Sequence, residues 1–149
     1  HAEKRRLPHT SQQMFDLVAD VEKYPEFLPL CQSLSVRSER ERDGKRLLIA
    51  DMTVAYKMVR ETFTSQVLLK PEDHQIDVKY VDGPFRYLDN RWTFEPAGDA
   101  QCDVKFFIDY EFKSRTLGLL MGSMFDFAFR RFAEAFERRA DEIYGPNPN

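Results

Sequence analysis

The feature that most constrains this chain is an alternation of apolar and polar residues that runs from residue 33 to residue 114. Its last segment is the most regular, because every second residue from Cys102 to Phe112 is apolar and most residues between them are charged. A period of two places successive side chains on opposite faces of a strand. Several such segments in a row predict an antiparallel sheet with one apolar face and one solvated face.

Turn residues divide this region into six strands. Asp43-Gly44 suits a tight hairpin, and Asp82-Gly83-Pro84 marks a later turn, as do residues 71–73 and 96–99. A further short strand is expected from Ala2 to Leu7, ahead of the alternating region. The sheet therefore includes a strand from the start of the chain as well as those of the alternating region.

Two short helices are predicted between the first strand and the rest of the sheet. Thr10 is a capping residue with Gln13 three positions later, at the start of a helix that ends near residue 20. A second helix begins at Val21, takes Pro25 in its first turn and ends before Pro29.

One long amphipathic helix is expected at the end of the chain, from about Arg115 to Tyr144. Gly145-Pro146 terminates it. The order β-α-α-β(6)-α over residues 1–149 describes a single α+β domain, in which a curved antiparallel sheet wraps around the long helix. Because one helix is narrower than such a sheet, the remaining groove must be filled by large side chains or by a ligand.

Composition excludes several function classes. The net charge is -3, with 22 basic and 25 acidic residues, which gives no overall attraction to DNA. No apolar run approaches the ~20 residues that span a membrane. Cys31 and Cys102 lack zinc-ligand spacing, so we expect two reduced, buried thiols, no metal site and a cytoplasmic location.

Three stretches carry a family resemblance over nearly the whole chain. They are residues 24–31 (YPEFLPLC), residues 81–86 (VDGPFR) with Trp92-Thr93-Phe94 after them, and residues 109–114 (DYEFKS). Together they resemble the coenzyme Q-binding START proteins, a family also labelled polyketide cyclase/dehydrase that includes ribosome association toxins. The resemblance implies a helix-grip fold of the START and Bet v 1 type.

The resemblance also implies a function without catalysis. A START protein of this kind binds ubiquinone or a related prenylated lipid in its groove, as a chaperone that supports respiration and ubiquinone synthesis. The quinone is then a bound ligand, and no cofactor is required. Two alternatives stay open: a toxin that binds the large ribosomal subunit and blocks subunit association, and an enzyme of the aromatase/cyclase type.

The groove candidates are large or polar residues at inward strand positions, on the second short helix, in the turn at residues 82–84 and on the long helix. They are Tyr24, Phe27, Leu28, Met52, Val54, Tyr56, Glu61, Phe63, Val78, Tyr80, Pro84, Phe85, Asn90, Trp92, Ile108, Tyr110, Met121, Met124 and Phe125.

Polar and exposed candidates each have two interpretations. Glu61 shares a strand face with apolar residues, where it either pairs near a strand end or contacts ligand. Asn90 either donates to a quinone carbonyl or satisfies a backbone group. Phe85 either belongs to an ordinary turn or lies over a mouth of the groove.

The remaining expectations concern the surface. Tyr24, Phe27 and Leu28 are core residues or form a lid between two prolines. The three histidines are expected to be solvated, and no catalytic motif is present. Leu119 and its neighbours on the long helix suggest a groove entrance or a transient contact with the inner membrane.

Overall fold

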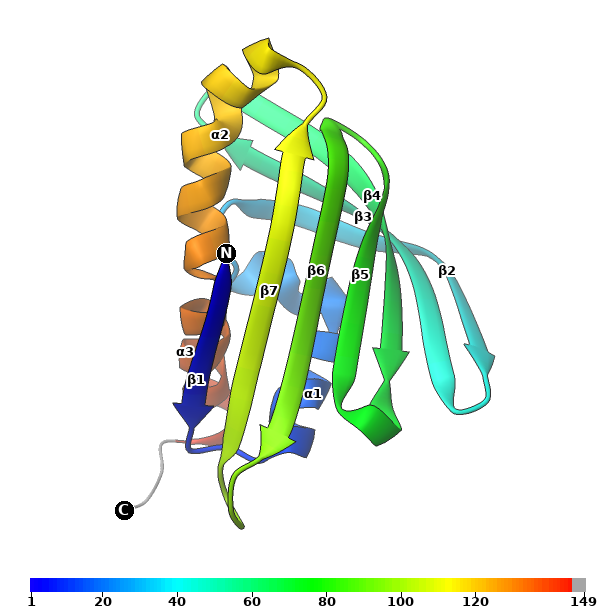
Figure 1. The fold of residues 1–149 in the computed structure, drawn as a ribbon, viewed down its shortest axis with the longest axis vertical. Helices are drawn as coiled ribbons and strands as arrows, with labels where there is room; N and C mark the ends of the chain where they lie inside the picture. Colours follow the sequence, from blue (N-terminus) through cyan, green and yellow to red (C-terminus); the bar gives the residue numbers. More distant parts are fainter. Residues whose placement is uncertain (146–149) are drawn as a thin grey trace.

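The computed structural model describes residues 1–145, in which a seven-stranded sheet curves around the C-terminal helices (Figure 1). The elements in chain order are β1 (Ala2–Leu7), α1 (Ser11–Ala19), the 3-10 helix η1 (Val21–Glu26), β2 (Cys31–Arg42), β3 (Lys45–Tyr56), β4 (Val59–Lys70), the 3-10 turn η2 (Pro71–Asp73), β5 (Gln75–Asp82), β6 (Phe85–Pro96), β7 (Cys102–Phe112), α2 (Arg115–Arg130) and α3 (Phe132–Tyr144).

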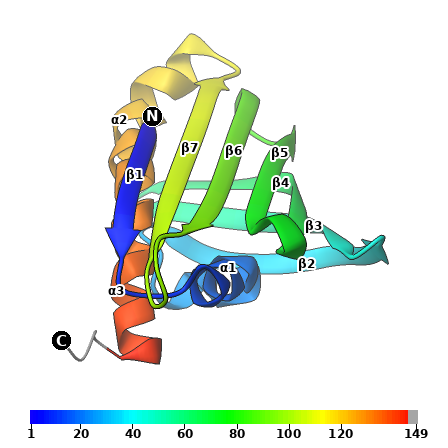
Figure 2. The ribbon, with the colours of Figure 1, turned by 60° about the horizontal axis from the view of Figure 1, so that its bottom comes forward.

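The sheet is antiparallel throughout, in the order β1-β7-β6-β5-β4-β3-β2. Consecutive hairpins join β2 to β7, and β1 returns from the start of the chain to pair with β7, Ala2 opposite Phe107. The helices α2 and α3 run along the concave side, while α1 lies across one end of the groove (Figure 2). The predicted helix-grip fold is confirmed.

Alternation places the core as predicted. In β7 the side chains of Cys102, Val104, Phe106 and Ile108 are buried, whereas Lys105 between them is exposed. The capping box of α1 is present as well: Thr10 Oγ1 accepts from the Gln13 N–H at 3.0 Å, and Gln13 Oε1 accepts from the Thr10 N–H at 2.9 Å.

The predicted single C-terminal helix is interrupted at Arg131, which corrects the sequence analysis. Arg131 has φ -106° and ψ 1°, and its N–H bonds to the Ala128 carbonyl at 3.0 Å, a turn tighter than the α-helix. Its own guanidinium donates to the Phe127 carbonyl at 3.0 Å. The side chain therefore takes the acceptor that a continuous helix would give to the backbone. The helix ends at Tyr144, before Gly145 at φ 82°, and Pro146 lies outside the described residues.

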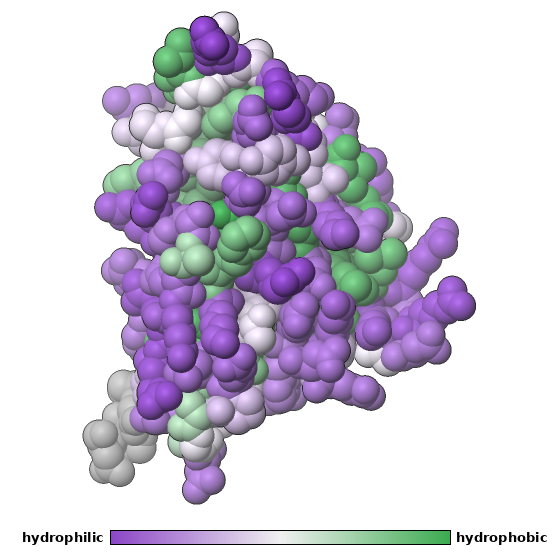
Figure 3. All heavy atoms as spheres, in the orientation of Figure 1, coloured by the Kyte–Doolittle hydropathy of each residue, from purple (hydrophilic) through white to green (hydrophobic). Residues whose placement is uncertain are grey.

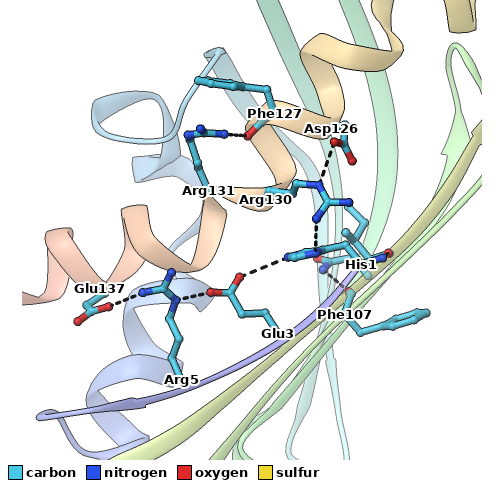
Figure 4. Close-up of polar contacts among 11 residues, drawn as sticks. His1, Glu3, Arg5, Phe107, Asp126, Phe127, Arg130, Arg131 and Glu137 are labelled. Carbon is cyan, nitrogen blue, oxygen red and sulfur yellow. Dashed lines mark hydrogen bonds and ion pairs between the residues drawn. The ribbon is translucent and has the colours of Figure 1, made fainter.

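Strand β1 contacts the helices on both sides of this interruption (Figure 4). Arg5 Nη1 donates to Glu137 Oε1 of α3 at 3.0 Å, and Arg5 also pairs with Glu3. His1 lies 3.4 Å from Arg130 Nη1 at the end of α2. An ion pair to α3 and a hydrogen bond to α2 therefore hold the two helices separately against the edge of the sheet.

The expectation that all three histidines are solvated is wrong for His9. Its side chain is buried, and Nε2 lies 2.7 Å from Asp141 Oδ1 on α3. The strand β1 ends under α3, so the residues that follow it are covered by that helix. His1 is exposed, and His74 is partly exposed beside η2, at φ 48°.

Candidate functional site

A cavity of about 70 Å³ lies between the concave face of the sheet and the C-terminal helices. Its lining comes from η1, from strands β2 to β7 and from both helices. The lining residues are Val21, Tyr24, Leu34, Ala50, Met52, Phe63, Ser65, Val67, Val78, Leu88, Asn90, Trp92, Ile108, Phe129, Phe132 and Phe136.

Short side chains on the sheet explain where this cavity forms. Ala50 of β3 pairs directly with Ser65 of β4, and both are buried. One step along, Val67 pairs with Val78 of β5. Because no large side chain rises from this part of the sheet, the aromatic rings above it do not fill the space.

Aromatic rings from η1 and the helices cover the cavity. The Tyr24 ring packs edge-on against Phe136 of α3, with centroids 5.2 Å apart, and Trp92 packs against the same ring at 5.0 Å. The Tyr24 hydroxyl donates to the Val18 carbonyl. Burial raises the pKa of Tyr24, so the phenol remains a neutral donor that ties η1 to α1.

The end of the groove beyond the cavity is closed by a packed aromatic cluster around Phe85. This ring has no exposed surface, and its centroid lies between 5.0 and 5.7 Å from five other rings. Those rings belong to Phe63, Tyr80, Tyr110, Phe112 and Phe125. The interpretation that placed Phe85 over a mouth of the groove is therefore wrong, because α2 covers this end.

Seven predicted groove residues line the cavity, namely Tyr24, Met52, Phe63, Val78, Asn90, Trp92 and Ile108. The other candidates lie outside the lining, in the aromatic cluster, elsewhere in the core or near the surface. They are Phe27, Leu28, Val54, Tyr56, Glu61, Tyr80, Pro84, Phe85, Tyr110, Met121, Met124 and Phe125. Contact of a bound ligand with any of these residues stays a prediction.

Sequence reasoning missed several lining residues. Leu34, Ala50, Val67 and Leu88 stand at inward positions of the alternation, which was the available signal. Ser65 shares the inward face of β4 with Phe63 and Val67, so the same signal applied to it. Phe129, Phe132 and Phe136 follow helical spacing around the interruption, and Val21 carried no signal of its own. The sequence pattern says which side chains face inward but not which of them leave space.

Two uncharged polar side chains reach the cavity, those of Asn90 and Ser65, besides the Tyr24 phenol. Asn90 Nδ2 donates to the Phe107 carbonyl at 2.8 Å, so this amide satisfies a backbone group. Ser65 Oγ is buried and has no hydrogen-bond partner within residues 1–145. Glu61 is partly buried opposite Val54 and lies outside the cavity.

The chemistry of this lining is that of a binding site for an apolar molecule. No charged side chain belongs to it in the described part of the chain. Among residues 1–145, no three His, Cys, Asp or Glu side chains gather as a metal site would require. Pockets for small molecules are mostly apolar with a few polar groups, and this cavity has that composition.

A family model described as polyketide cyclase/dehydrase and lipid transport matches residues 7–137. The chain belongs to this family. A polyketide cyclase/lipid transport domain thus accounts for almost every element described above, from the end of β1 to the middle of α3.

Two curated relatives of this family member carry different names. The ribosome association toxin RatA of Vibrio cholerae is 36% identical over 136 residues, which is 91% of each chain. A mitochondrial coenzyme Q-binding protein homologue of Xenopus laevis is 32% identical over 97% of this chain and 59% of its own length.

Two solved structures confirm the fold. The 18 kDa protein CC1736 of Caulobacter crescentus is 32% identical, with a TM-score of 0.78 over 97% of each chain. The Zhui aromatase/cyclase of Streptomyces sp. R1128 has a TM-score of 0.77 over 97% of this chain and 94% of its own, at 15% identity. At that identity the likeness extends to the fold alone.

Proposed function

We propose that this protein binds a prenylated quinone, or a closely related apolar lipid, in the cavity between the sheet and the C-terminal helices, without changing it chemically. The observation that carries this proposal is the lining, which is aromatic and aliphatic apart from three uncharged polar side chains. The name of the Xenopus relative supports the quinone as the ligand. The protein would then act as a quinone chaperone for respiration and ubiquinone synthesis.

The volume of the cavity sets a condition on binding. At about 70 Å³ it is well below the roughly 300–1,000 Å³ of common ligand pockets. A quinone ring must therefore displace side chains. Tyr24 on η1 and Phe132 at the start of α3 are only partly buried, and Phe132 follows the interruption at Arg131. We propose that these two rings move apart to admit the ligand.

Burial of an isoprenoid tail would provide most of the affinity. Each buried CH₂ contributes roughly 0.8 kcal/mol, so a few isoprene units outweigh any single polar contact. The polar groups of the cavity would then select the head group.

The proposal includes no catalysis. A cyclase or dehydratase needs an acid or base beside the reacting carbon. The polar side chains in the lining are a serine, an amide and a tyrosine whose burial raises its pKa, and none of them is a carboxylate or an imidazole. The alternative of an aromatase/cyclase activity is supported by the fold alone.

Native mass spectrometry with organic extraction of the gently purified protein tests this function. We expect a co-purified prenylquinone at a stoichiometry near one in the unaltered protein. Ala50→Leu places a larger side chain in the cavity and should abolish the adduct. Ala55→Leu on the outer face of the same strand should retain it. Absence of any adduct, together with no uptake of added quinone, would refute the proposal.

The name of the Vibrio relative favours a second function, association with the ribosome. Contacts with ribosomal RNA are mostly to phosphates, so such binding would weaken steeply with salt. Co-sedimentation with large subunits at low and high salt measures it. The near balance of acidic and basic residues offers little general attraction to RNA, so this function would need a local basic surface.

A transient membrane contact belongs to the quinone proposal. At the start of α2, Leu119 is 82% and Leu120 68% exposed, and Met58 in the β3–β4 turn is 98% exposed. Figure 3 shows apolar surface at this end of the molecule, above a mostly hydrophilic sheet face. Within the described chain no helix is long and apolar enough to cross a membrane, so we propose a peripheral contact through these side chains.

A further inference from the structure

We infer that Ser65 is the side chain that recognises the head group, by donating a hydrogen bond from Oγ to a carbonyl oxygen of an apolar, uncharged ligand. This inference rests on the proposed function, which says only that the cavity binds an apolar molecule of the quinone type. It assigns the polar recognition to one atom.

The position of Ser65 is unusual for a hydroxyl. It stands on β4 between Phe63 and Val67, pairs with Ala50 on one side and Tyr80 on the other, and is 6% exposed. Its Oγ has no partner within residues 1–145. Buried polar groups in native proteins are nearly always hydrogen-bonded, so an unpartnered hydroxyl facing a cavity points to a group that enters from outside.

Hydroxyl side chains close to Ser65 that point to the outer face of the sheet do have hydrogen-bond partners. On the outer face of the same sheet, Thr53 Oγ1 bonds to Thr62 Oγ1 at 2.7 Å. Thr64, the residue before Ser65, donates to Asp51 Oδ1 at 2.5 Å. On the inner face, Ser65 Oγ has no hydrogen-bond partner within residues 1–145, so its donor stays free for a ligand.

Asn90 and Tyr24 are weaker choices for this role. Asn90 already donates to the Phe107 carbonyl across the β6–β7 pair, and the Tyr24 hydroxyl donates to the Val18 carbonyl. The Tyr24 O–H and one of the two Asn90 N–H groups are therefore used by the protein itself. The Ser65 hydroxyl is a donor that nothing else in the described structure uses. A ligand oxygen pairs with it, whereas a ligand without that oxygen leaves the hydroxyl unpaired, so the site discriminates between the two ligands.

The lining also restricts the chemistry of the ligand. It contains no Lys, Arg or His that could neutralise an anion, which argues against a fatty-acid carboxylate or a phosphate at this position. A carbonyl oxygen accepts from the serine without bringing a proton of its own that would need another partner. A ketone or quinone on a flat apolar ring therefore suits the site.

Paired ligands with and without the carbonyl oxygens test the assignment. We would measure the affinities of 2-methyl-1,4-naphthoquinone and 2-methylnaphthalene by equilibrium dialysis. The unaltered protein should prefer the quinone by about tenfold, the factor expected for one neutral hydrogen bond in a buried site. Ser65→Ala should lose this preference through weaker quinone binding, with hydrocarbon binding unchanged.

Two further variants complete the experiment. Ser65→Thr keeps the hydroxyl and should keep the preference. Ser11→Ala removes another buried hydroxyl that has no partner within residues 1–145, but Ser11 lies at the start of α1 outside the lining, so the preference should stay. If Ser65→Ala still preferred the quinone over the hydrocarbon by the same factor, the role of Ser65 would be overturned, while the proposed function would stand. Failure of the unaltered protein to bind either compound would overturn the proposed function and this inference with it.

Discussion

His9 and Asp141 form the residue-scale contact that ties the segment after β1 to α3. The His9 ring is 3% exposed, and its Nε2 lies 2.7 Å from Asp141 Oδ1. Asp141→Asn should lower the free energy of unfolding by about 1–2 kcal/mol, because the bond to a charged acceptor is lost beside a buried ring.

Urea denaturation measures this effect. Asp126→Asn is the control, since its ion pair with Arg130 is half-exposed on both sides and should contribute less than about 0.5 kcal/mol. Equal effects of the two substitutions would show that the buried histidine contact adds nothing.

The two cysteines predict a dependence of stability on pH. Burial raises the pKa of Cys102 from its ordinary value of 9.0 to about 11, with Asp103 adding to the rise, and burial raises that of Cys31 to about 11. Above pH 9 the unfolded thiols lose protons that the folded thiols keep, so stability falls as the pH rises from 9 to 11.

Cys102→Ala should therefore reduce the loss of stability between pH about 8 and pH about 10.5, measured by urea denaturation at each pH. Burial also raises the pKa of Tyr110, so part of the loss should remain in the variant. An unchanged slope in Cys102→Ala would contradict the assignment of this proton to Cys102.

At the scale of elements, the turn between β5 and β6 depends on Gly83. Its φ is +143°, and a Cβ there would lie 2.6 Å from the Phe63 Cβ. Gly98 also has a positive φ, +117°, but a Cβ there would meet no atom within 4 Å. Gly83→Ala should therefore cost at least about 2 kcal/mol more than Gly98→Ala, because it adds a backbone clash to the same kind of strain.

Thermal and urea denaturation of the two alanine variants measures this difference. Similar losses of stability would mean that the Phe63 backbone shifts to make room, and that the turn does not fix the end of β4.

The elements show how far sequence reasoning reaches. Alternation predicted the inward faces of β3 to β7, and Thr10 with Gln13 predicted the start of α1, because both signals are local. The interruption at Arg131 was missed because it depends on one side chain taking the Phe127 carbonyl. Helical spacing continues across that point and gives no sign of it.

The site was predicted less completely than the fold. Inward positions were identified, but the cavity depends on which of them are short beneath which rings. Ala50 and Ser65 create the space only because they pair across two strands. The Phe85 cluster fills the other end only because five rings from four elements meet there. Most of these contacts form between residues far apart in the sequence, so local sequence patterns do not predict them.

At the scale of the whole molecule, Leu119 and Leu120 are mostly exposed at the end where α2 begins. L119E/L120E should reduce co-flotation with vesicles of phosphatidylcholine and phosphatidylglycerol by at least about tenfold, because two apolar side chains leave the interface. Ile143→Glu on α3 is the matched control, since Ile143 is 51% exposed at the other end. Equal loss in both variants, or none in either, would contradict a contact through α2.

The central claim is that an apolar quinone enters the cavity beside Trp92. Trp92 is the single tryptophan of the chain and lines the cavity, so its fluorescence reports directly on the site. Titration with a short-chain ubiquinone should quench this emission saturably at a stoichiometry of one, and Ala50→Leu should abolish the quenching. Emission that stays constant, or that falls only linearly and equally in both proteins, would contradict the account.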